Sequence, residues 1–137
     1  MWIKVFTTIN VFIYRLTRGI LGSKMGGQSI LLLYTTGRKS GKTHIIAITY
    51  FRDGENYLLV ASNWGKDHHP AWYHNLMSQS AADIQVKARK LRVSARQATA
   101  EEYDRLWNYV TSRNPIYVRY QQQTRRKIPV IILKPEL

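Results

Sequence analysis

The sequence contains no cysteine and few acidic residues. Without cysteine, disulfide bonds, thiol catalysis and zinc sites with cysteine ligands are all excluded. Eight Asp and Glu residues stand against 21 Lys and Arg residues, which leaves a formal net charge of +13. A positive charge of this size favours phosphates, polyanionic ligands, nucleic acid or anionic lipid headgroups as partners. No uninterrupted apolar run approaches the length of a membrane span.

The first 27 residues differ from the remainder, because large apolar side chains recur there every three or four positions. On a helical wheel these side chains fall on one side and three cations lie opposite. The apolar positions are Trp2, Phe6, Ile9, Ile13, Leu16 and Ile20, and the cations are Lys4, Arg15 and Arg18. We therefore predict an amphipathic helix within residues 1–27, followed by one domain over residues 28–137.

This helix has two possible positions. It can pack on the domain as a lid, or it can lie on an anionic membrane surface through residues 2–20. The net charge favours the membrane surface, because anionic headgroups attract basic proteins. We expect a cytoplasmic protein, which in the second case is peripheral on the inner face of the plasma membrane.

A basic turn, residues 35–43, lies between two apolar, strand-like runs. It contains two glycines, four hydroxyl side chains and three cations, Arg38, Lys39 and Lys42. Together with its backbone amides, these groups could cradle a phosphate. The turn does not match a Walker nucleotide loop, because Thr36 stands where a glycine is required and a strand follows instead of a helix. A solvated basic hairpin loop is the alternative.

Beyond the basic turn, the pattern predicts a meander of strands with short helices inserted. We expect strands at residues 31–34, 43–52, 57–61, 83–88, 91–98 and 128–133, the first three consecutive and antiparallel. Asp53-Gly54 is a strong hairpin signal. Helices are expected at residues 71–77 after Pro70, after the capping box that begins at Thr99, and after Asn114-Pro115.

Several motifs in a fixed order together resemble the deazaflavin-dependent nitroreductase family. They are Thr35-Thr36-Gly37-Arg38-Lys39-Ser40-Gly41, Tyr50-Phe51-Arg52-Asp53-Gly54, Val60-Ala61-Ser62-Asn63, His69-Pro70-Ala71-Trp72-Tyr73-His74-Asn75-Leu76, and Tyr117-Val118-Arg119-Tyr120-Gln121 with Arg126-Lys127-Ile128-Pro129-Val130. The resemblance covers nearly everything from Ser29 to Pro135. It implies an α+β, mainly β fold, a split β-barrel that binds coenzyme F420. The anionic phosphodiester and oligoglutamate tail of F420 suit a basic protein, and FMN is the nearest alternative cofactor.

The resemblance also implies roles for individual residues. Those expected to bind the cofactor are Arg38, Lys39 and Ser40 at its phosphate, with Lys42 and His44 beside them, Ala61, Ser62, Asn63 and Trp64 along the deazaflavin ring and its side chain, and Trp72 near the ring. Those expected to line the acceptor pocket are Thr49, Asn114, Tyr117 and Tyr120. Thr49 and Asn114 replace further pocket tyrosines of some members. His44 replaces an arginine and Ala47 a proline, so charge at position 44 depends on pH.

The reaction implied by the resemblance is hydride transfer from the reduced cofactor to an electron-poor small molecule, such as a quinone, a nitroaromatic or an unsaturated lipid-like compound. The cofactor carries the chemistry, and the protein supplies position and electrostatics. Ser62, Tyr117 and Tyr120 are the candidates for orienting the acceptor or relaying a proton. Two tyrosines three residues apart on a helix are also typical of simple packing.

A nucleic-acid-binding domain is the strongest rival from another class. Its basic stripe would consist of Lys87, Arg89, Lys90, Arg92, Arg96, Arg119, Arg125, Arg126 and Lys127. We regard nucleic acid as the weaker partner, because cations that alternate along a strand are usually its solvated face. No metal site is expected, since His68, His69 and His74 lack the helical i, i+4 spacing of a ligand pair. The sequence does not indicate an oligomeric state.

Overall fold

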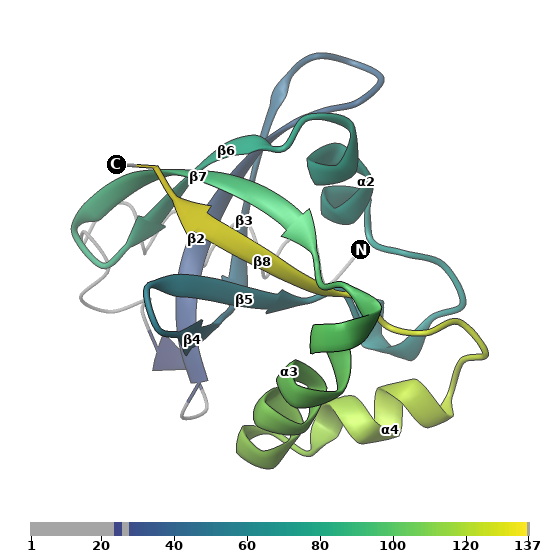
Figure 1. Ribbon diagram of the computed structural model, residues 1–137. Coiled ribbons are helices and arrows are strands. Elements are labelled where there is room, and N and C mark those ends of the chain that lie inside the picture. The colour runs from purple at the N-terminus through teal and green to yellow at the C-terminus, as the bar shows by residue number, and fades with distance from the viewer. Residues whose placement is uncertain (1–23, 26–27, 137) are drawn as a thin grey trace.

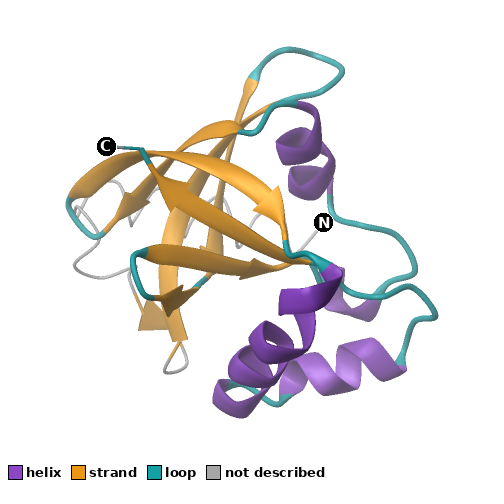
Figure 2. Cartoon of the chain, in the orientation of Figure 1, coloured by secondary structure: helices purple, strands orange, loops and turns teal. Residues whose placement is uncertain are grey.

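An eight-stranded antiparallel sheet forms the body of the molecule and curls into a half-barrel (Figures 1 and 2). The computed structural model describes residues 24–25 and 28–136. Neighbouring strands follow the order β1-β2-β6-β7-β8-β5-β4, and β3 also pairs with β2. The strands are β1 (Lys24–Met25), β2 (Gln28–Thr36), β3 (Thr43–Thr49), β4 (Phe51–Asp53), β5 (Asn56–Val60), β6 (Ala81–Val86), β7 (Arg89–Gln97) and β8 (Val130–Pro135).

The described part of the chain has four helical segments, which lie over different faces of the sheet (Figure 1). They are η1 (Asn63–Gly65), α2 (Ala71–Ser78), α3 (Ala100–Arg113) and α4 (Ile116–Gln122). The predicted starts of the last three, after Pro70, Thr99 and Asn114-Pro115, are confirmed. Within the described part of the chain, no helix combines the length and apolar character needed to cross a bilayer. The amphipathic helix predicted within residues 1–27 falls outside the described residues, apart from the two residues of β1.

The β2–β3 hairpin carries the basic turn, as predicted. Its pairing runs from Thr36 opposite Thr43 to Ile30 opposite Thr49. The single strand predicted over residues 43–52 is wrong, because the chain bends at Tyr50 and β4 begins at Phe51. Tyr50 packs on the inner core, and Phe51 lies in a second core under α3 and α4. As a result β5 pairs with β4 and β8, not with β3.

Three other predicted strand starts each shift by two residues. The β6–β7 hairpin turns at residues 87–88, where Lys87 has φ 56°. Strand β6 therefore begins at Ala81 and β7 at Arg89, each two residues earlier than predicted. The last strand begins at Val130 instead of Ile128. The amide of Ile128 is bound to the Gln121 side chain at 2.9 Å, and Pro129 has no N–H to donate to a ladder.

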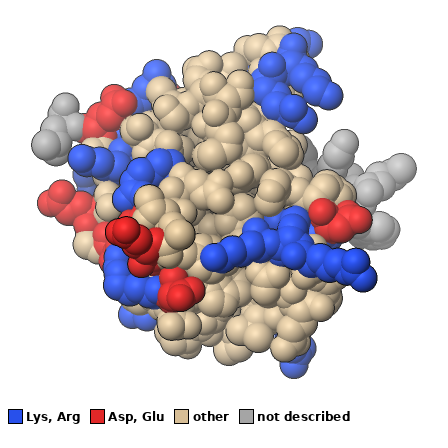
Figure 3. All heavy atoms as spheres, turned by 45° about the vertical axis from the view of Figure 1, so that its right-hand side comes forward, with Lys and Arg blue, Asp and Glu red and all other residues tan. Residues whose placement is uncertain are grey.

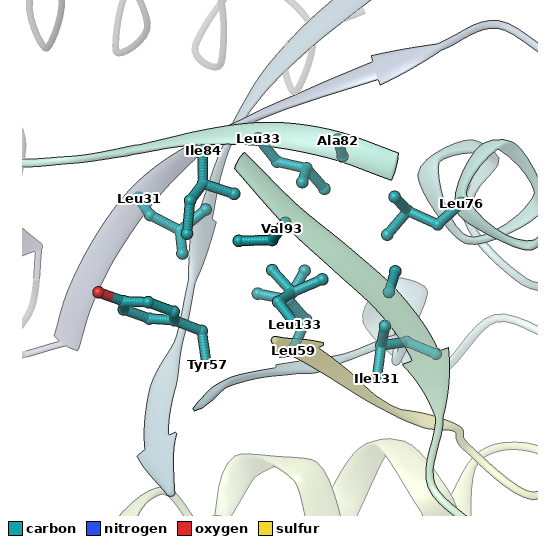
Figure 4. Close-up of a cluster of buried hydrophobic side chains, with 11 residues drawn as sticks. Leu31, Leu33, Tyr57, Leu59, Leu76, Ala82, Ile84, Val93, Ile131 and Leu133 are labelled. Atoms are coloured by element: carbon teal, nitrogen blue, oxygen red, sulfur yellow. The ribbon is translucent and has the colours of Figure 1, made fainter. Parts of the chain in front are cut away.

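Apolar side chains from five strands and α2 fill the inside of the curled sheet (Figure 4). Alternate positions of each strand point inward, which is the period that a one-sided core requires. The labelled members are Leu31, Leu33, Tyr57, Leu59, Leu76, Ala82, Ile84, Val93, Ile131 and Leu133. The side chain of Leu76 comes from α2 and joins this helix to the barrel core.

A second core lies on the opposite face of β5 and β8. Leu58 and Val60 of β5 pack there against Leu106 and Val110 of α3 and Tyr117 of α4. Since Leu59 faces the inner core, β5 is buried on both faces and reads as a continuous apolar run. This second core fixes α3 and α4 against the sheet.

The capping box of α3 includes a carboxylate whose pKa is strongly perturbed. Glu102 accepts a hydrogen bond from the Thr99 amide at 2.8 Å and pairs with Arg96 of β7. Its hydrogen bonds to Arg96 and then to Thr99 lower the pKa of Glu102 to about 2. The charge of Glu102 therefore stabilises the fold above the ordinary glutamate pKa, and this contribution is lost as pH falls toward about 2.

We expect Glu102→Gln to lower the free energy of unfolding by about 1 kcal/mol at pH 7, the typical value of a helix cap. The difference from wild type should shrink as pH falls below about 4.3, because Glu102 then loses its advantage over the neutral amide. Urea unfolding across this range measures it. Glu101→Gln, an exposed neighbour in the same turn, is the control. An equal loss in the control, or a difference independent of pH, would contradict the assignment.

Candidate functional site

The basic turn is closed by its own hydrogen bonds and presents its cations to solvent. The Gly37 amide donates to the Lys42 carbonyl at 2.7 Å, and the Gly41 amide donates to the Gly37 carbonyl at 2.9 Å. The Ser40 hydroxyl accepts from the Lys42 amide at 3.1 Å. Gly41 has φ 71°, a conformation that favours glycine. The turn therefore holds its shape while its cations are exposed.

Ser40 and His44 converge over Gly37. A methyl group at Gly37 would come within 2.6 Å of Ser40 Oγ and 2.7 Å of His44 Nε2. Glycine at this position leaves room for the hydroxyl and the imidazole to lie together. The predicted cofactor-binding set Arg38, Lys39, Ser40, Lys42 and His44 is thus brought to one turn and its first strand residues.

Asn75 of α2 anchors the basic turn from below. Its Oδ1 accepts from the Arg38 amide at 3.1 Å, and its Nδ2 donates to Thr35 Oγ1 at 3.2 Å. Asn75 is buried, so losing either partner would leave an unsatisfied polar group. No role was predicted for Asn75. The available signal was an amide in the middle of a helix next to the apolar Leu76, but its partners lie about 40 residues away and only the fold reveals them.

The loop that follows β5 has an unusual backbone. Asn63, Trp64 and Gly65 have φ values of 49°, 61° and 79°, although only one of them is glycine. Such conformations in non-glycine residues tend to occur at functional sites. The loop buries Ala61 and Ser62 and leaves the Trp64 side chain 57% exposed. The Asn63 side chain donates to the His68 carbonyl at 3.0 Å.

A chain of aromatic rings links this loop to α4 and the sheet. Trp64 meets Tyr120 edge-on with ring centroids 6.3 Å apart, and Tyr120 meets Tyr117 at 6.1 Å. Tyr117 also contacts Phe51 at 6.0 Å and is hydrogen-bonded to Thr49. The structure thus brings Thr49, Tyr117, Tyr120 and Trp64 together.

Tyr117 keeps its proton at neutral pH. Burial, with a smaller effect from Tyr120, raises the pKa of Tyr117 to about 12. Its hydroxyl can therefore donate a hydrogen bond to an oxygen that gains negative charge, but it is not a base near neutral pH.

Two predicted site residues have structural contacts of their own. Trp72 of α2 packs against the inner core. Asn114 is the C-terminal cap residue of α3. Its Oδ1 accepts a hydrogen bond at 3.3 Å from the amide of Ile116, the first residue of α4. Arg126, which was placed from the sequence in a family motif and in the basic stripe without a site role, lies against the loop after β5 and donates to its carbonyls.

Most cations of the proposed basic stripe are engaged locally. Arg92 pairs with Asp83 and Arg96 with Glu102, while Lys90 and Lys127 lie over the rings of Tyr34 and Tyr103. On the face shown in Figure 3, Lys and Arg form separate groups, with Asp and Glu among some of them. This arrangement does not favour a continuous nucleic-acid surface. Within the described residues, no group of three potential ligands could hold a metal ion.

Comparisons with known proteins show the family and the fold of the chain. A family model described as F420H(2)-dependent quinone reductase matches residues 6–135. An F420H(2)-dependent quinone reductase of Mycobacterium tuberculosis strain H37Rv is 41% identical over 125 residues, which cover 88% of this chain and 84% of the relative. A solved F420-H2 dependent reductase (FDR-A) is 34% identical, with a TM-score of 0.70, and the match covers 77% of this chain and 93% of that one.

A more distant structure shows the fold alone. The heme storage protein HutZ from Vibrio cholerae is 14% identical, with a TM-score of 0.62 over 91% of this chain and 89% of that one. These matches confirm the split β-barrel expected from the sequence.

Gly65 allows the loop after β5 to approach α4 closely. A methyl group there would come within 2.4 Å of Gln123 Oε1 and 3.1 Å of Tyr120 Cα. We expect Gly65→Ala to destabilise the protein and to weaken cofactor binding, because alanine is strained at the positive φ of 79° and the loop must shift slightly from the α4 backbone as the Gln123 side chain rotates away. Thermal unfolding and ligand titration measure the two effects.

Gly54→Ala is the matched control for backbone strain. Gly54 also has a positive φ, 61°, but nothing lies within 4 Å of the added methyl. It should cost only the strain of the left-handed conformation, about 1–2 kcal/mol, with no change in ligand affinity. Equal ligand affinities in the two variants would show that the contact with α4 does not shape the site.

Proposed function

Since the chain belongs to the F420H(2)-dependent quinone reductase family, it is an F420-dependent oxidoreductase, and we propose that its acceptor is a small quinone-like molecule reduced at the aromatic cluster. The resemblance noted in the sequence, the enzyme class and the cofactor are all confirmed by the family match. When bound, F420 supplies the hydride. The residues of this chain bind and orient both reactants.

The observation that carries the proposal is the position of α2 between two candidate binding elements. The loop after β5 leads directly into this helix, and Asn75 on the same helix holds the basic turn. Figure 1 shows the turn and η1 beyond opposite ends of α2. A cofactor with a phosphate at one end and a ring at the other suits this arrangement.

The basic turn fits the phosphate. Arg38, Lys39 and Lys42 are exposed cations, and the Ser40 hydroxyl and His44 imidazole lie together over Gly37. Charge-assisted hydrogen bonds to phosphate are stronger than neutral ones. We propose that this turn holds the phosphodiester, with the anionic tail attracted by the same charges.

The loop after β5 fits the ring. Ser62 places its hydroxyl at the end of β5, and Trp64 offers an exposed flat apolar surface. We propose that Ala61 to Trp64 lie along the deazaflavin, with Trp72 of α2 nearby.

The aromatic cluster fits the acceptor. Tyr117 stays protonated, and its ring lies 6.1 Å from that of Tyr120, so two tyrosines with hydroxyl groups lie close together. Hydrogen-bond donors held in place near a quinone oxygen stabilise the charge that develops there on hydride transfer. We propose Ser62, Tyr117 and Tyr120 as the groups that orient the acceptor, with Asn114 at the edge of the pocket and the proton supplied by solvent.

A charge-removal experiment tests the phosphate assignment. Arg38→Ala combined with Lys39→Ala should weaken F420 binding several-fold or more, because two charge-assisted contacts are lost. The difference from wild type should shrink in high salt. Fluorescence titration with F420 and FMN side by side measures both affinities, and wild type should bind F420 more tightly.

Arg89→Ala combined with Lys134→Ala is the control, since it removes two charges from the sheet. If this control weakened binding as much as the turn variant, the effect would be one of net charge alone. Tighter binding of FMN than F420 would overturn the cofactor assignment. Micromolar, sequence-tolerant DNA binding at physiological salt would favour the nucleic-acid alternative.

We further propose that residues 2–20 attach the protein to an anionic membrane surface on its cytoplasmic side. The support is the apolar stripe of that segment, its opposed cations and the net charge of +13. Attachment would keep the enzyme close to apolar quinone-like acceptors.

Vesicle flotation tests this attachment. The full-length protein should float with vesicles that contain anionic lipid, and a variant without its first 20 residues should not, while its melting temperature stays close to that of the full chain. Trp2→Glu combined with Phe6→Glu should also abolish flotation. Absence of flotation by the full chain, together with a lower melting temperature after truncation, would instead assign the segment to a structural lid.

A further inference from the structure

Arg126 holds the loop after β5 by its main chain. Its Nε donates to the Lys66 carbonyl at 2.9 Å, its Nη1 to the Ala61 carbonyl at 3.1 Å, and its Nη2 to the Ser62 carbonyl at 2.7 Å. One rigid, planar guanidinium thus binds three carbonyls at both ends of a six-residue loop. A lysine could not reproduce this, because its donors all lie on a single atom.

His69 accepts a fourth hydrogen bond from Arg126. Its Nδ1 lies 2.9 Å from Nη1 of the guanidinium. Arginine only donates, so Nδ1 must be an acceptor and the imidazole must be neutral with its proton on Nε2. The contact therefore depends on the protonation state of His69.

Arg126 is itself fixed by α4. The Gln121 side chain donates to the Arg126 carbonyl at 2.7 Å and accepts from the Ile128 amide at 2.9 Å. Thr124 Oγ1 accepts from the Arg126 amide at 3.3 Å. The helix that carries Tyr117 and Tyr120 thus also places the group that holds the loop.

We propose that Arg126 is a positioning residue for hydride transfer: its guanidinium fixes residues 61–66 so that the bound ring is held at a constant place relative to the tyrosines of α4. This rests on the proposed function, in which Ala61 to Trp64 lie along the ring. The left-handed residues 63–65 are strained, and a strained loop keeps its shape only where its surroundings determine it. The hydrogen bonds from Arg126 to its four acceptors hold the loop in this shape.

His69 makes this arrangement sensitive to pH. The groups that face its ring are Arg126, Tyr73 at a centroid distance of 4.3 Å, His74 at 5.8 Å and His68, with Asp67 paired to His68. Burial and then the charge of Arg126 lower the pKa of His69. His69 therefore becomes protonated only at a pH below its ordinary pKa. Its Nδ1 would then carry a proton, and the hydrogen bond from the Arg126 guanidinium would be lost.

Arg126→Lys tests the positioning role, with Arg125→Lys at an exposed neighbouring position as control. Arg126→Lys should lower kcat at least tenfold, because small displacements of reacting groups are costly. The same variant should raise the dissociation constant of F420 only a few-fold, since the basic turn of the β2–β3 hairpin is unchanged. Arg125→Lys should change neither.

Two further measurements separate positioning from general stability. Amide exchange at Gly65 and Lys66, measured without cofactor, should accelerate in Arg126→Lys and not in Arg125→Lys. Added guanidinium at a non-denaturing concentration should restore part of kcat to Arg126→Ala. Unchanged exchange and kcat in Arg126→Lys, in an enzyme whose wild type reduces quinones with F420, would overturn the inference. A wild type that does not bind F420 would overturn the proposed function instead.

His69→Gln tests the pH sensitivity, because glutamine keeps an acceptor that does not titrate. The melting temperature of wild type should fall as pH drops below about 6.5, because the unfolded chain then takes up a proton that the folded site resists. Its kcat should fall only at lower pH, where His69 of the folded enzyme becomes protonated. His69→Gln should match wild type at pH 7.5 and lose less on acidification. Identical pH profiles for the two proteins would remove His69 from the arrangement.

Discussion

The whole molecule depends on burial of β5 on both of its faces. Leu59 faces the inside of the barrel, while Leu58 and Val60 face the helices, and burying each such side chain contributes about 1.5–3 kcal/mol. One short strand therefore joins the inner core to the core beneath α3 and α4. The loop proposed to lie along the cofactor ring leaves directly from the end of this strand. Its starting point is consequently one of the most firmly held positions in the protein.

Electrostatic and aromatic functions are assigned to separate elements. The cations of the basic turn stay in water, where they attract an anion. Asn75 joins that turn to α2 through the Arg38 amide and the Thr35 hydroxyl. The aromatic rings lie on other elements, where Trp64 of the loop after β5 meets Tyr120 of α4 and Tyr120 meets Tyr117. Tyr117 is buried, and hydrogen bonds to a developing charge are stronger away from water. We infer that this separation lets the protein recognise a phosphate by charge at one element and orient a planar acceptor by hydroxyl groups at another.

Local features were predictable from the sequence, and long-range polar contacts were not. The basic turn, the capping box at Thr99 and the helix after Pro70 depend on neighbouring residues, and the barrel topology followed from the family resemblance. The bend at Tyr50 was missed because apolar residues continue across it, and periodicity alone gives no sign that consecutive residues serve two different cores. Arg126 was noted in a family motif and in the basic stripe but was given no site role, since its acceptors lie about 60 residues earlier in the chain.

The close contact between η1 and α4 also limits how homologous enzymes of this kind can diverge. A side chain at position 65 would require the Gln123 side chain to rotate away and the backbone at Tyr120 to shift by a few tenths of an ångström, so changes in this loop and in α4 are coupled. New acceptor preferences should therefore arise by exchanging side chains on the exposed face of α4, while the helix axis stays in place. Inserted or deleted residues should accumulate elsewhere, for example at the β6–β7 turn, where the only cost is local.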